Sequence, residues 1–522
     1  MVKKDDRDKE KALPKSTIVA EKRVLIGLIW NCAAELKLIL TALLLLCSFA
    51  TLLQFLPSRF FPFYYPTYTY TTLPSNCPPN VTVAVVATPP LPVAEVVLDN
   101  GVVKRSFNPV GTAAYNFILV SAYRGGPNTF AIIGLSSKPL HVYGRPSYTC
   151  EYHSNKENDI DDGNNIDNGS NNETVVVSVR GRKILPDWGY GRVYTTIVIN
   201  CTFPDTSIVS TPTVGGQLIL KAAVNGGFDA ELDPTDTILA LTEPANSWNL
   251  SKYTNTPPKY DYLYCGSPIY GNLSPQRVRE WIAYHVRLFG ERSHFVIYDA
   301  GGVHPEVLEV LKPWMELGYV TLQDVREQER FDAYYHNQFA VVNDCLHRYR
   351  FDAKWMFFFD VDEFVYLAEG DTFEDVMESV GEYSMFTIEQ IPMSNQLCLL
   401  KDAGKTSKKW GFEKLVYKNV KKVARRDRKY AIQPRNVFAT GVHISQNYQG
   451  NYLMKTGHLM KYYHYHGTVA QRREPCRQFD NGMSVVADGI PYVQDTNMMS
   501  IAPLVKSFEL KTIGSRLEST RQ

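Results

Sequence analysis

The stretch Trp355-Met356-Phe357-Phe358-Phe359-Asp360-Val361-Asp362-Glu363-Phe364 decides the fold of this chain. Its first five residues are apolar with no polar alternation, which predicts a strand buried on both faces, as in a parallel sheet. Two acids spaced by one residue follow at once. Ligands of parallel sheets bind beyond the carboxyl ends of the strands, so the two carboxylates are a candidate binding group. A solvated strand end or a helix cap is the structural alternative.

Alternating strand and helix patterns lead up to this stretch from residue 260 onward. Strands are predicted in YDYLYCG, HFVIYDAGG and YVTLQDV, and helices in RVREWIAYHVRLF, PEVLEVLKPWMEL and FDAYYHNQFAVVNDCLHRYR. Ser274 and Pro275 supply a cap and a first-turn proline for the first helix, and Gly290 follows its end. Residues 256–500 are therefore expected to form an α/β domain with a mostly parallel sheet, and the acids are expected at its ligand-binding edge.

An uncharged apolar segment at residues 38–56 is long enough to cross a bilayer. The 37 residues before it hold nine Lys and Arg against six Asp and Glu, whereas the next forty hold a single basic residue, Arg59. Because positive charge stays on the cytosolic side, the sequence predicts a single-pass type II membrane protein with a cytosolic tail at 1–37. A cleaved signal peptide and a buried soluble helix are the alternatives.

Sequons and cysteines agree with a lumenal location for the rest of the chain. Glycosylation sequons occur at Asn80, Asn168, Asn172, Asn200, Asn249 and Asn272. Seven cysteines follow the apolar segment: Cys77, Cys150, Cys201, Cys265, Cys345, Cys398 and Cys476. An oxidising lumen permits disulfides, and the odd count leaves at least one thiol unpaired in a monomer.

Three further regions differ in composition. Residues 57–92 are rich in Pro, Tyr and Thr and are expected to form an extended stalk, and residues 501–522 a C-terminal tail. Residues 93–255 hold short β-rich runs broken by Gly, Pro and Asn, which predicts an all-β, sandwich-like module. Its aromatics (Trp188, Tyr190, Tyr194 and Trp248) are expected either to bind carbohydrate or to pack in its core.

The chain length limits the number of domains, and the net charge limits the kinds of binding partner. A chain of 522 residues predicts two or three domains. The net charge of +1 gives no global field for nucleic acid.

The acids suit a hard divalent cation that is shared with a nucleotide diphosphate. We expect Asp362 to ligate Mn²⁺ or Mg²⁺ directly, Asp360 to do so directly or through water, and Glu363 to support them. His464 and His466 share one face of a strand and are expected to complete the metal shell or contact phosphate, with His443 in reserve. Hydrogen-bonded surface histidines are the alternative.

Two clusters of basic residues are candidates for binding anionic groups. Arg472, Arg473 and Arg477 are candidates for binding pyrophosphate or an anionic acceptor, with a solvated loop as the alternative. The basic residues between Lys408 and Lys429 are expected to form a solvated face that could attract acidic glycan.

Four motifs together resemble glycosyltransferase family 92, and within it the plant β-1,4-galactan synthases. They are YCGSPIYGNLSPQRVREWIAYH, HNQFAVVNDCLHRYR, WMFFFDVDEF and KYYHYHGTVAQRREPCRQF, in this order, between residues 260 and 500. The resemblance implies a GT-A fold, a UDP-galactose donor, Mn²⁺, inversion at the sugar, a Golgi membrane location and β-1,4-galactan chains of pectin as acceptor. It also implies a carbohydrate-binding role for the β module, and a homodimer is expected by analogy.

The resemblance also implies positions for the site. The metal motif falls on Asp360 and Asp362 and the histidine motif on His464 and His466, with Asp299 and the helix carrying Gln338 and Asn343 beside the nucleotide. An inverting reaction needs a carboxylate base, for which Glu389 is the first candidate and Asp402 and Glu474 are others.

Two other functions stay open from the sequence. One is the same fold with another donor, such as UDP-glucose or UDP-arabinopyranose. The other is a membrane-tethered glycan-binding protein without turnover.

Overall fold

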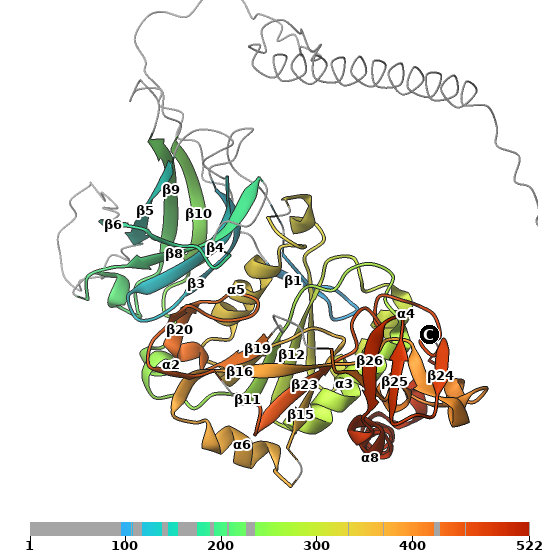
Figure 1. The fold of residues 1–522 in the computed structure, drawn as a ribbon. Coiled ribbons are helices and arrows are strands. Elements are labelled where there is room, and N and C mark those ends of the chain that lie inside the picture. The colour runs from blue at the N-terminus through green and yellow to red at the C-terminus, as the bar shows by residue number, and fades with distance from the viewer. Residues whose placement is uncertain are drawn as a thin grey trace, which may run out of the picture. The chain divides into compact units, whose positions relative to one another are not determined.

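The apolar run before the two acids forms strand β14 (Ala353–Phe358) inside an eleven-stranded mixed sheet (Figure 1). Strands β13 (Val320–Asp324), β12 (Ser293–Asp299), β11 (Tyr260–Cys265) and β14 are neighbours in that order and run parallel. Helices α3 (Pro275–Phe289), α4 (Pro305–Glu316) and α5 (Gln338–Arg348) connect them, as the alternating sequence pattern predicts. The predicted helix over 331–350 is wrong at its start: α5 begins at Gln338, because the three residues before it have left-handed backbone conformations. Beyond β14 the sheet continues through β19 (Arg428–Ile432), β16 (Tyr383–Pro392), β23 (Met460–His464) and β15 (Glu363–Leu367), with β22 (Asn451–Leu453) on β16.

The structure is a computed structural model, and it describes only part of the chain. The described residues are 95–105, 107, 117–137, 145–154, 175–187, 193–205, 208–225, 235–331, 333–368, 370–421, 428–454 and 456–520. The predicted tail, membrane segment and stalk at 1–92, and also Trp188 and Tyr190, lie outside them. Within these ranges, no helix combines the length and the apolar character needed to cross a membrane.

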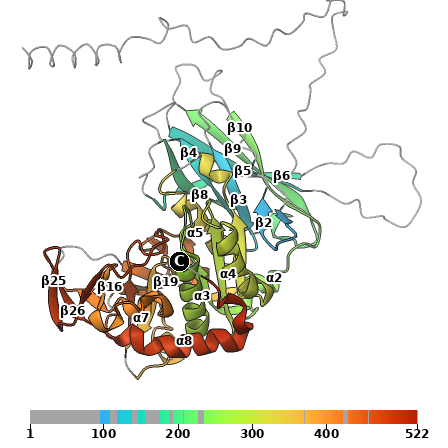
Figure 2. The same ribbon diagram turned by 90° about the vertical axis from the view of Figure 1, so that its right-hand side faces the viewer.

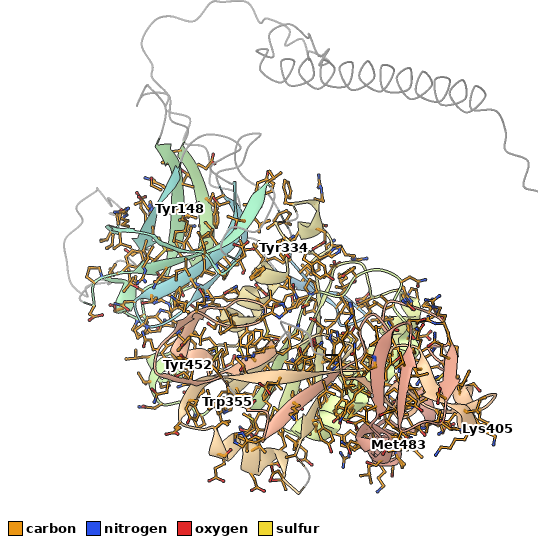
Figure 3. The ribbon with its side chains drawn as sticks, in the orientation of Figure 1. Tyr148, Tyr334, Trp355, Lys405, Tyr452 and Met483 are labelled. Atoms are coloured by element: carbon orange, nitrogen blue, oxygen red, sulfur yellow. A yellow bond between two sulfur atoms is a disulfide. The ribbon has the colours of Figure 1, made fainter. Side chains whose placement is uncertain are left out.

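Both faces of β14 are buried, as its unbroken apolar sequence predicts. Trp355 (labelled in Figure 3) and Phe357 belong to the core that α3 and α4 cover, whereas Met356 and Phe358 belong to the core that α5 covers. None of these four residues is more than 2% exposed. Figure 2 shows α3, α4 and α8 (Asn497–Ile513) on one side of this domain.

The β module consists of two four-stranded antiparallel sheets. One contains β3 (Ile118–Arg124), β4 (Thr129–Ser137), β8 (Tyr194–Thr202) and β7 (Arg182–Ile184); the other contains β10 (Thr235–Glu243), β9 (Gly216–Asn225), β5 (Arg145–Ser154) and β6 (Val175–Arg180). The core between them includes Phe130, Tyr152 and Ile199, and the Cys150–Cys201 disulfide ties β5 to β8. Two predicted ligand-stacking aromatics are engaged in packing, Tyr194 against Phe331 and Trp248 against Arg124 and Tyr253.

Two boundaries differ from the sequence prediction. The first strands, β1 (Glu95–Val97) and β2 (Val103–Arg105), belong to the main sheet and not to the β module, because β2 pairs in parallel with β13 and covers an otherwise open edge. Residues 501–520 are no loose tail: α8 packs into the main core, and Glu509 forms a buried ion pair with Arg279. The tail prediction missed this partner because Arg279 lies 230 residues earlier.

The remaining elements are short. They are the helices α2 (Leu250–Thr254), α6 (Phe373–Ser379) and α7 (Gly411–Lys414), the 3-10 turns η2 (Ile208–Ser210), η3 (Gln328–Phe331), η4 (Leu400–Asp402), η5 (Thr406–Lys408), η6 (Pro434–Asn436) and η7 (Gly514–Leu517), and the strands β17 (Leu397–Leu399), β18 (Tyr417–Asn419), β20 (Val437–Ala439), β21 (Asn447–Tyr448), β24 (Gln478–Asp480), β25 (Ser484–Ala487) and β26 (Ile490–Gln494).

Three disulfides use six of the seven cysteines that follow the apolar segment. Besides the bond inside the β module, Cys265 at the end of β11 is bonded to Cys345 in α5, and Cys398 in β17 to Cys476. The seventh, Cys77, lies outside the described residues.

A buried charge cluster joins the β module to the main sheet. Asp344 in α5 is 4% exposed and accepts hydrogen bonds from Tyr123 of β3 and Tyr298 of β12, each at 2.6 Å. Arg105 and Arg348 lie 3.5 and 3.3 Å from its two oxygens. Burial acts to raise the pKa of Asp344, but the charges of the two arginines and the tyrosine hydrogen bonds hold that pKa well below its usual value.

Asp344→Asn should lower the free energy of unfolding by about 3 kcal/mol, because it removes the more buried of the two carboxylates that Arg105 and Arg348 share and leaves them only Glu95. Asp371→Asn, an exposed aspartate, is the matched control. Because the folded-state pKa of Asp344 is lowered, its contribution is present at neutral pH and is lost as the pH falls below about 4 toward the folded-state value. Denaturant unfolding at pH 7 and pH 3 should therefore show a smaller gap between the native chain and the variant at pH 3. An equal effect of both substitutions would contradict the role of the cluster.

Candidate active site

The two acids lie in a tight turn between β14 and β15, at the carboxyl edge of the parallel strands. The turn covers residues 359–362, because β14 ends at Phe358 and β15 begins at Glu363. Ser267 follows β11 and Asp299 ends β12 at the same edge. The carboxyl ends of neighbouring parallel strands meet here, which is where such sheets bind ligands.

Asp360 is fixed by two donors. Ser267 Oγ donates to Asp360 Oδ1 at 2.6 Å, and Lys429 Nζ donates to Asp360 Oδ2 at 2.7 Å. Gln338, at the start of α5, donates in turn to Ser267. Burial acts to raise the pKa of Asp360, but the Lys429 ammonium and these hydrogen bonds bring that pKa down to about 2.

Lys429 lies at the acid turn, although the sequence predicts a solvated position for it. It was expected on a solvated basic face, yet it is 2% exposed and points into the acid turn from β19. Its Nζ also lies 3.5 Å from Glu363 Oε2. Alternation along a strand offers the physical reason, since Arg428 and Lys429 must point to opposite faces of the sheet.

Glu363 buttresses the turn from inside. It is 1% exposed, and its Oε2 accepts the backbone N–H of Asp360 at 2.7 Å. Burial raises the pKa of Glu363 to about 7 although the nearby Lys429 charge opposes the rise. Its position fits the supporting role predicted for it.

Asp362 is enclosed by the histidine segment. Its Oδ2 accepts the backbone N–H of Gly467 at 2.8 Å, and its backbone carbonyl accepts the N–H of Tyr465 at 3.0 Å. Gly467 has φ 71°, a left-handed conformation that glycine adopts without strain. The chain turns there, and this turn brings the backbone N–H onto the carboxylate.

His464 lies beside Asp362, at the end of β23, which pairs with β15. His464 Nε2 lies 3.6 Å from Asp362 Oδ1, and Nδ1 is hydrogen-bonded to the side-chain amide of Gln390. Burial acts to lower the pKa of His464, but the hydrogen bond to Asp362 and the charges of Asp362 and Glu363 raise it to about 9. The exposed His466 ring stacks on His464 with centroids 5.2 Å apart.

The donor set fits a divalent cation in part. Asp362 offers a carboxylate oxygen from the turn, and His464 offers an imidazole nitrogen from β23 once its proton is displaced, a combination that suits Mn²⁺. Both oxygens of Asp360 already accept hydrogen bonds. Across the described ranges, no three His, Cys, Asp or Glu side chains are grouped closely enough to hold a metal ion by themselves. A cation here would take its remaining ligands from substrate phosphate and water.

The residues expected beside a nucleotide have different positions. Asp299 is 5% exposed and accepts the backbone N–H groups of Gly301 and Val303, which shapes the loop after β12. Gln338 reaches the acid turn through Ser267. Asn343 is fully buried and its amide is used by the backbone of Phe339 and Thr440, so it braces that loop and is not open to a nucleotide.

The three candidate arginines and His443 lie toward the surface. Arg472 is ion-paired with Glu306, and the guanidinium of Arg473 donates to Gln471. Arg477 donates to Gln396. His443 Nδ1 lies 3.1 Å from the backbone carbonyl of Arg428.

The three candidate bases are apart from the Asp362–His464 pair. In the described part of the chain, none of them forms a hydrogen bond or ion pair with either residue. Asp402 is bound by Lys409 and Glu474 by Lys414, each at 2.8 Å. Glu389 lies in β16 next to Gln390, and because Gln390 points toward His464, Glu389 points to the other face.

A strained tyrosine turn beside the acids has no clear signal in the sequence. Tyr335, His336 and Asn337 are consecutive and all left-handed, with φ of 48°, 56° and 56°. The Tyr335 hydroxyl is 2.7 Å from that of Tyr270, and the ring of Tyr270 stacks on His336 at 3.8 Å. Burial and the contact with Tyr335 raise the pKa of Tyr270, and the charges of Asp360 and Asp362 add to the rise. Strain of this kind collects at functional sites.

Comparisons with known proteins cover the segment that contains this site. A sequence profile of glycosyltransferase family 92 matches residues 260–499, which contain every residue of the acid turn. A galactan β-1,4-galactosyltransferase of Arabidopsis thaliana (GALS3) is 56% identical over 511 residues, covering 96% of this chain and 98% of the relative. A second one from the same plant (GALS2) is 54% identical over 534 residues, with the same coverage. A β-1,4-galactosyltransferase of Caenorhabditis elegans (galt-1) is 28% identical over 221 residues, 40% of this chain and 49% of the relative.

Lys429→Met should destabilise the protein by about 3 kcal/mol, because it leaves Glu363 and Asp360 without their cation. Lys421→Met, on the same basic run but exposed, should change the free energy of unfolding by less than about 0.5 kcal/mol. Adding Asp360→Asn to Lys429→Met should recover part of the loss, as denaturant unfolding would measure. A Lys429→Met protein as stable as Lys421→Met would exclude the ion pair as a structural requirement.

Proposed function

The chain belongs to glycosyltransferase family 92, and on that premise we propose that it transfers galactose from UDP-galactose to β-1,4-galactan with inversion, using a divalent cation such as Mn²⁺. The observation that carries the proposal is the Asp362–His464 pair at the carboxyl edge of the parallel sheet, inside the matched segment. The acceptor follows from relatives named galactan β-1,4-galactosyltransferases, which this chain matches over 96% of its length.

Each residue of the acid turn has a task in this reaction. Asp362 and His464 would hold the cation, and Asp360 would contribute directly or through water. The bound cation supplies neutralisation of the diphosphate leaving group. Lys429 and Ser267 keep Asp360 ionised and in one orientation, and the backbone N–H of Gly467 fixes the orientation of the Asp362 carboxylate. Preorganised groups of this kind need little rearrangement when charge develops.

The proposed setting is the Golgi lumen, with the chain anchored by residues 38–56 as a type II membrane protein. Three disulfides support an oxidising compartment. A pectin acceptor fits the same compartment, and a homodimer is part of the proposal by analogy with related transferases.

Full-length protein in detergent should transfer galactose from UDP-galactose to β-1,4-galactooligosaccharides only when a divalent cation is present. EDTA should abolish transfer and Mn²⁺ should restore it. Asp362→Asn should lower kcat by roughly 100-fold or more, because the lost interaction acts on the leaving group. Asp371→Asn should leave kcat unchanged. Product linkage is read by mass spectrometry.

The same assay separates the other candidate functions. If UDP-glucose or UDP-arabinopyranose turned over faster than UDP-galactose, that nucleotide sugar would be the donor. Full activity in EDTA would remove the cation from the proposal. If Asp362→Ala kept the biological function and glycan binding while no UDP-sugar turned over, the tethered glycan-binding function would be correct.

Three variants test the general base: Glu389→Gln, Asp402→Asn and Glu474→Gln. The substitution that removes the base should lower kcat roughly 100-fold to 10,000-fold while UDP binding, measured by calorimetry, is unchanged. Asp402→Asn and Glu474→Gln should also lower the unfolding temperature, because each leaves a lysine without its partner. Undiminished transfer in all three variants would assign the base to another carboxylate.

A further inference from the structure

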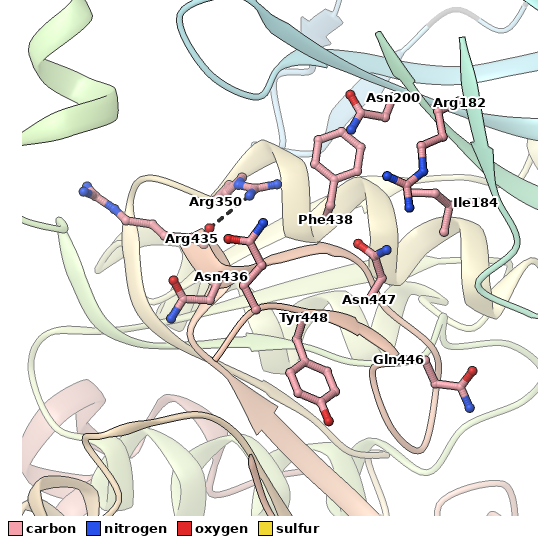
Figure 4. Close-up of a pocket in the computed structure, with 11 residues that line it drawn as sticks. Arg182, Ile184, Asn200, Arg350, Arg435, Asn436, Phe438, Gln446, Asn447 and Tyr448 are labelled. Atoms are coloured by element: carbon pink, nitrogen blue, oxygen red, sulfur yellow. Dashed lines mark hydrogen bonds between the residues drawn. The ribbon is translucent and has the colours of Figure 1, made fainter. Parts of the chain in front are cut away.

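A cavity of about 330 Å³ lies where the β module meets the catalytic domain, and it shares no residue with the acid turn (Figure 4). Arg182, Ile184 and Asn200 reach it from β7 and β8. The other lining residues come from the catalytic domain, around η6, β20 and β21: Arg350, Arg435, Asn436, Phe438, Gln446, Asn447, Tyr448 and Gln449. Both sides belong to one compact unit of the chain.

The lining carries three arginines, and none of the described residues that line the cavity is acidic. Arg350 is the most buried of the three, at 9% exposed. Its Nη2 donates to the backbone carbonyl of Arg435 at 3.0 Å, drawn as a dashed line in Figure 4. Its Nε and Nη1, and Nε of Arg435, are buried without an acceptor among the described residues.

A buried guanidinium without an acceptor is costly, so the missing acceptor is the main feature of this cavity. Ion pairing elsewhere in the chain gives the contrast, since Arg105 and Arg348 both reach carboxylates. Burial alone lowers the pKa of Arg350 to about 10. Arg350 therefore stays charged at neutral pH, and an anion from outside the chain would satisfy it.

The rest of the lining suits a sugar ring. Five amide side chains supply donors and acceptors for hydroxyl groups. The rings of Phe438 and Tyr448 supply apolar faces for C–H groups. Phe438 also lies 5.2 Å from the Arg350 guanidinium carbon, which holds that side chain in place. The cavity volume is that of a small-ligand site.

We propose that this cavity binds a sugar carboxylate, namely a hexuronate unit of an acidic glycan. The guanidinium of Arg350, whose Nε and Nη1 have no acceptor among the described residues, would take the carboxylate together with that of Arg182. The amides and rings would take the hydroxyls and the ring face. This site is separate from the proposed transfer site, so the two proposals are tested independently.

Two ligands that differ in one group test the proposal. D-galacturonate and D-galactose differ only in carboxylate against hydroxymethyl at C6. Calorimetry and ligand-observed NMR with the full-length protein should give binding of D-galacturonate at least about tenfold tighter than that of D-galactose. Sulfate, a bare anion, should bind more weakly than D-galacturonate.

Arg350→Met and Arg182→Met should each weaken D-galacturonate binding about tenfold, because each removes a charged donor. Arg182 is exposed, so its variant tests the site even if Arg350→Met fails to fold. Arg516→Met, an arginine 58% exposed and outside the cavity, should bind as the native chain does. None of these residues belongs to the acid turn, so transfer and unfolding temperature should stay unchanged in Arg182→Met.

Asn200 heads an Asn-Cys-Thr sequon, so a glycan on it would enter the same cavity. The assay therefore includes Thr202→Ala, which removes the sequon and leaves the lining intact. Binding of D-galacturonate to the native chain or to Thr202→Ala supports the proposal. Equal binding of D-galacturonate and D-galactose, tighter binding of sulfate, or full binding in both Arg182→Met and Arg350→Met would overturn it.

Discussion

The acid turn depends on one ammonium group. Lys429 Nζ lies between Asp360 and Glu363, at 2.7 and 3.5 Å, where almost no water reaches it. Without this charge, three carboxylates within four residues would repel each other, and burial would keep at least one of them protonated. Glu363 in turn accepts the backbone N–H of Asp360, so the charge also determines the shape of the turn. Since Lys429 sits on β19, which pairs with β14, the register of the sheet sets the geometry of the site.

Local patterns made the parallel half of the fold predictable. Short stretches of sequence are enough to show the alternation of apolar strands with capped helices. The unbroken apolar run at residues 355–359 indicates a strand that is buried on both faces. The segment 363–367 and the histidines come together only through pairing of β15 with β23, about a hundred residues apart, which no window contains. The histidine motif could still be predicted, because imidazole beside an Asp-x-Asp motif is chemically suggestive.

The sequence does not show which residue pairs with each buried charged side chain. Lys429 stands in a run of basic residues that reads as a solvated face, and Glu509 stands in a segment that reads as a tail. Both are buried, because their partners are supplied by strands and helices far away in the chain. The same reason hides the cavity at the β module: Arg182, Arg350 and Arg435 are far apart in the chain, and they line one cavity only because β7 and β8 lie next to the segments around η6, β20 and β21. The general base could not be fixed because its identity depends on where the acceptor lies.

The pairing of β2 with β13 changes how the chain should be divided. The β sandwich is an insertion that interrupts the catalytic sheet between its edge hairpin and its first central strand, so the junction near residue 255 is only one of two. A chimera that exchanges the sandwich with a single cut there would carry away the hairpin and Arg105, leaving β13 exposed and Asp344 short of a cation. Transplanting the module, or recombining it with another catalytic domain, therefore requires a splice at each end, after β2 and before β11.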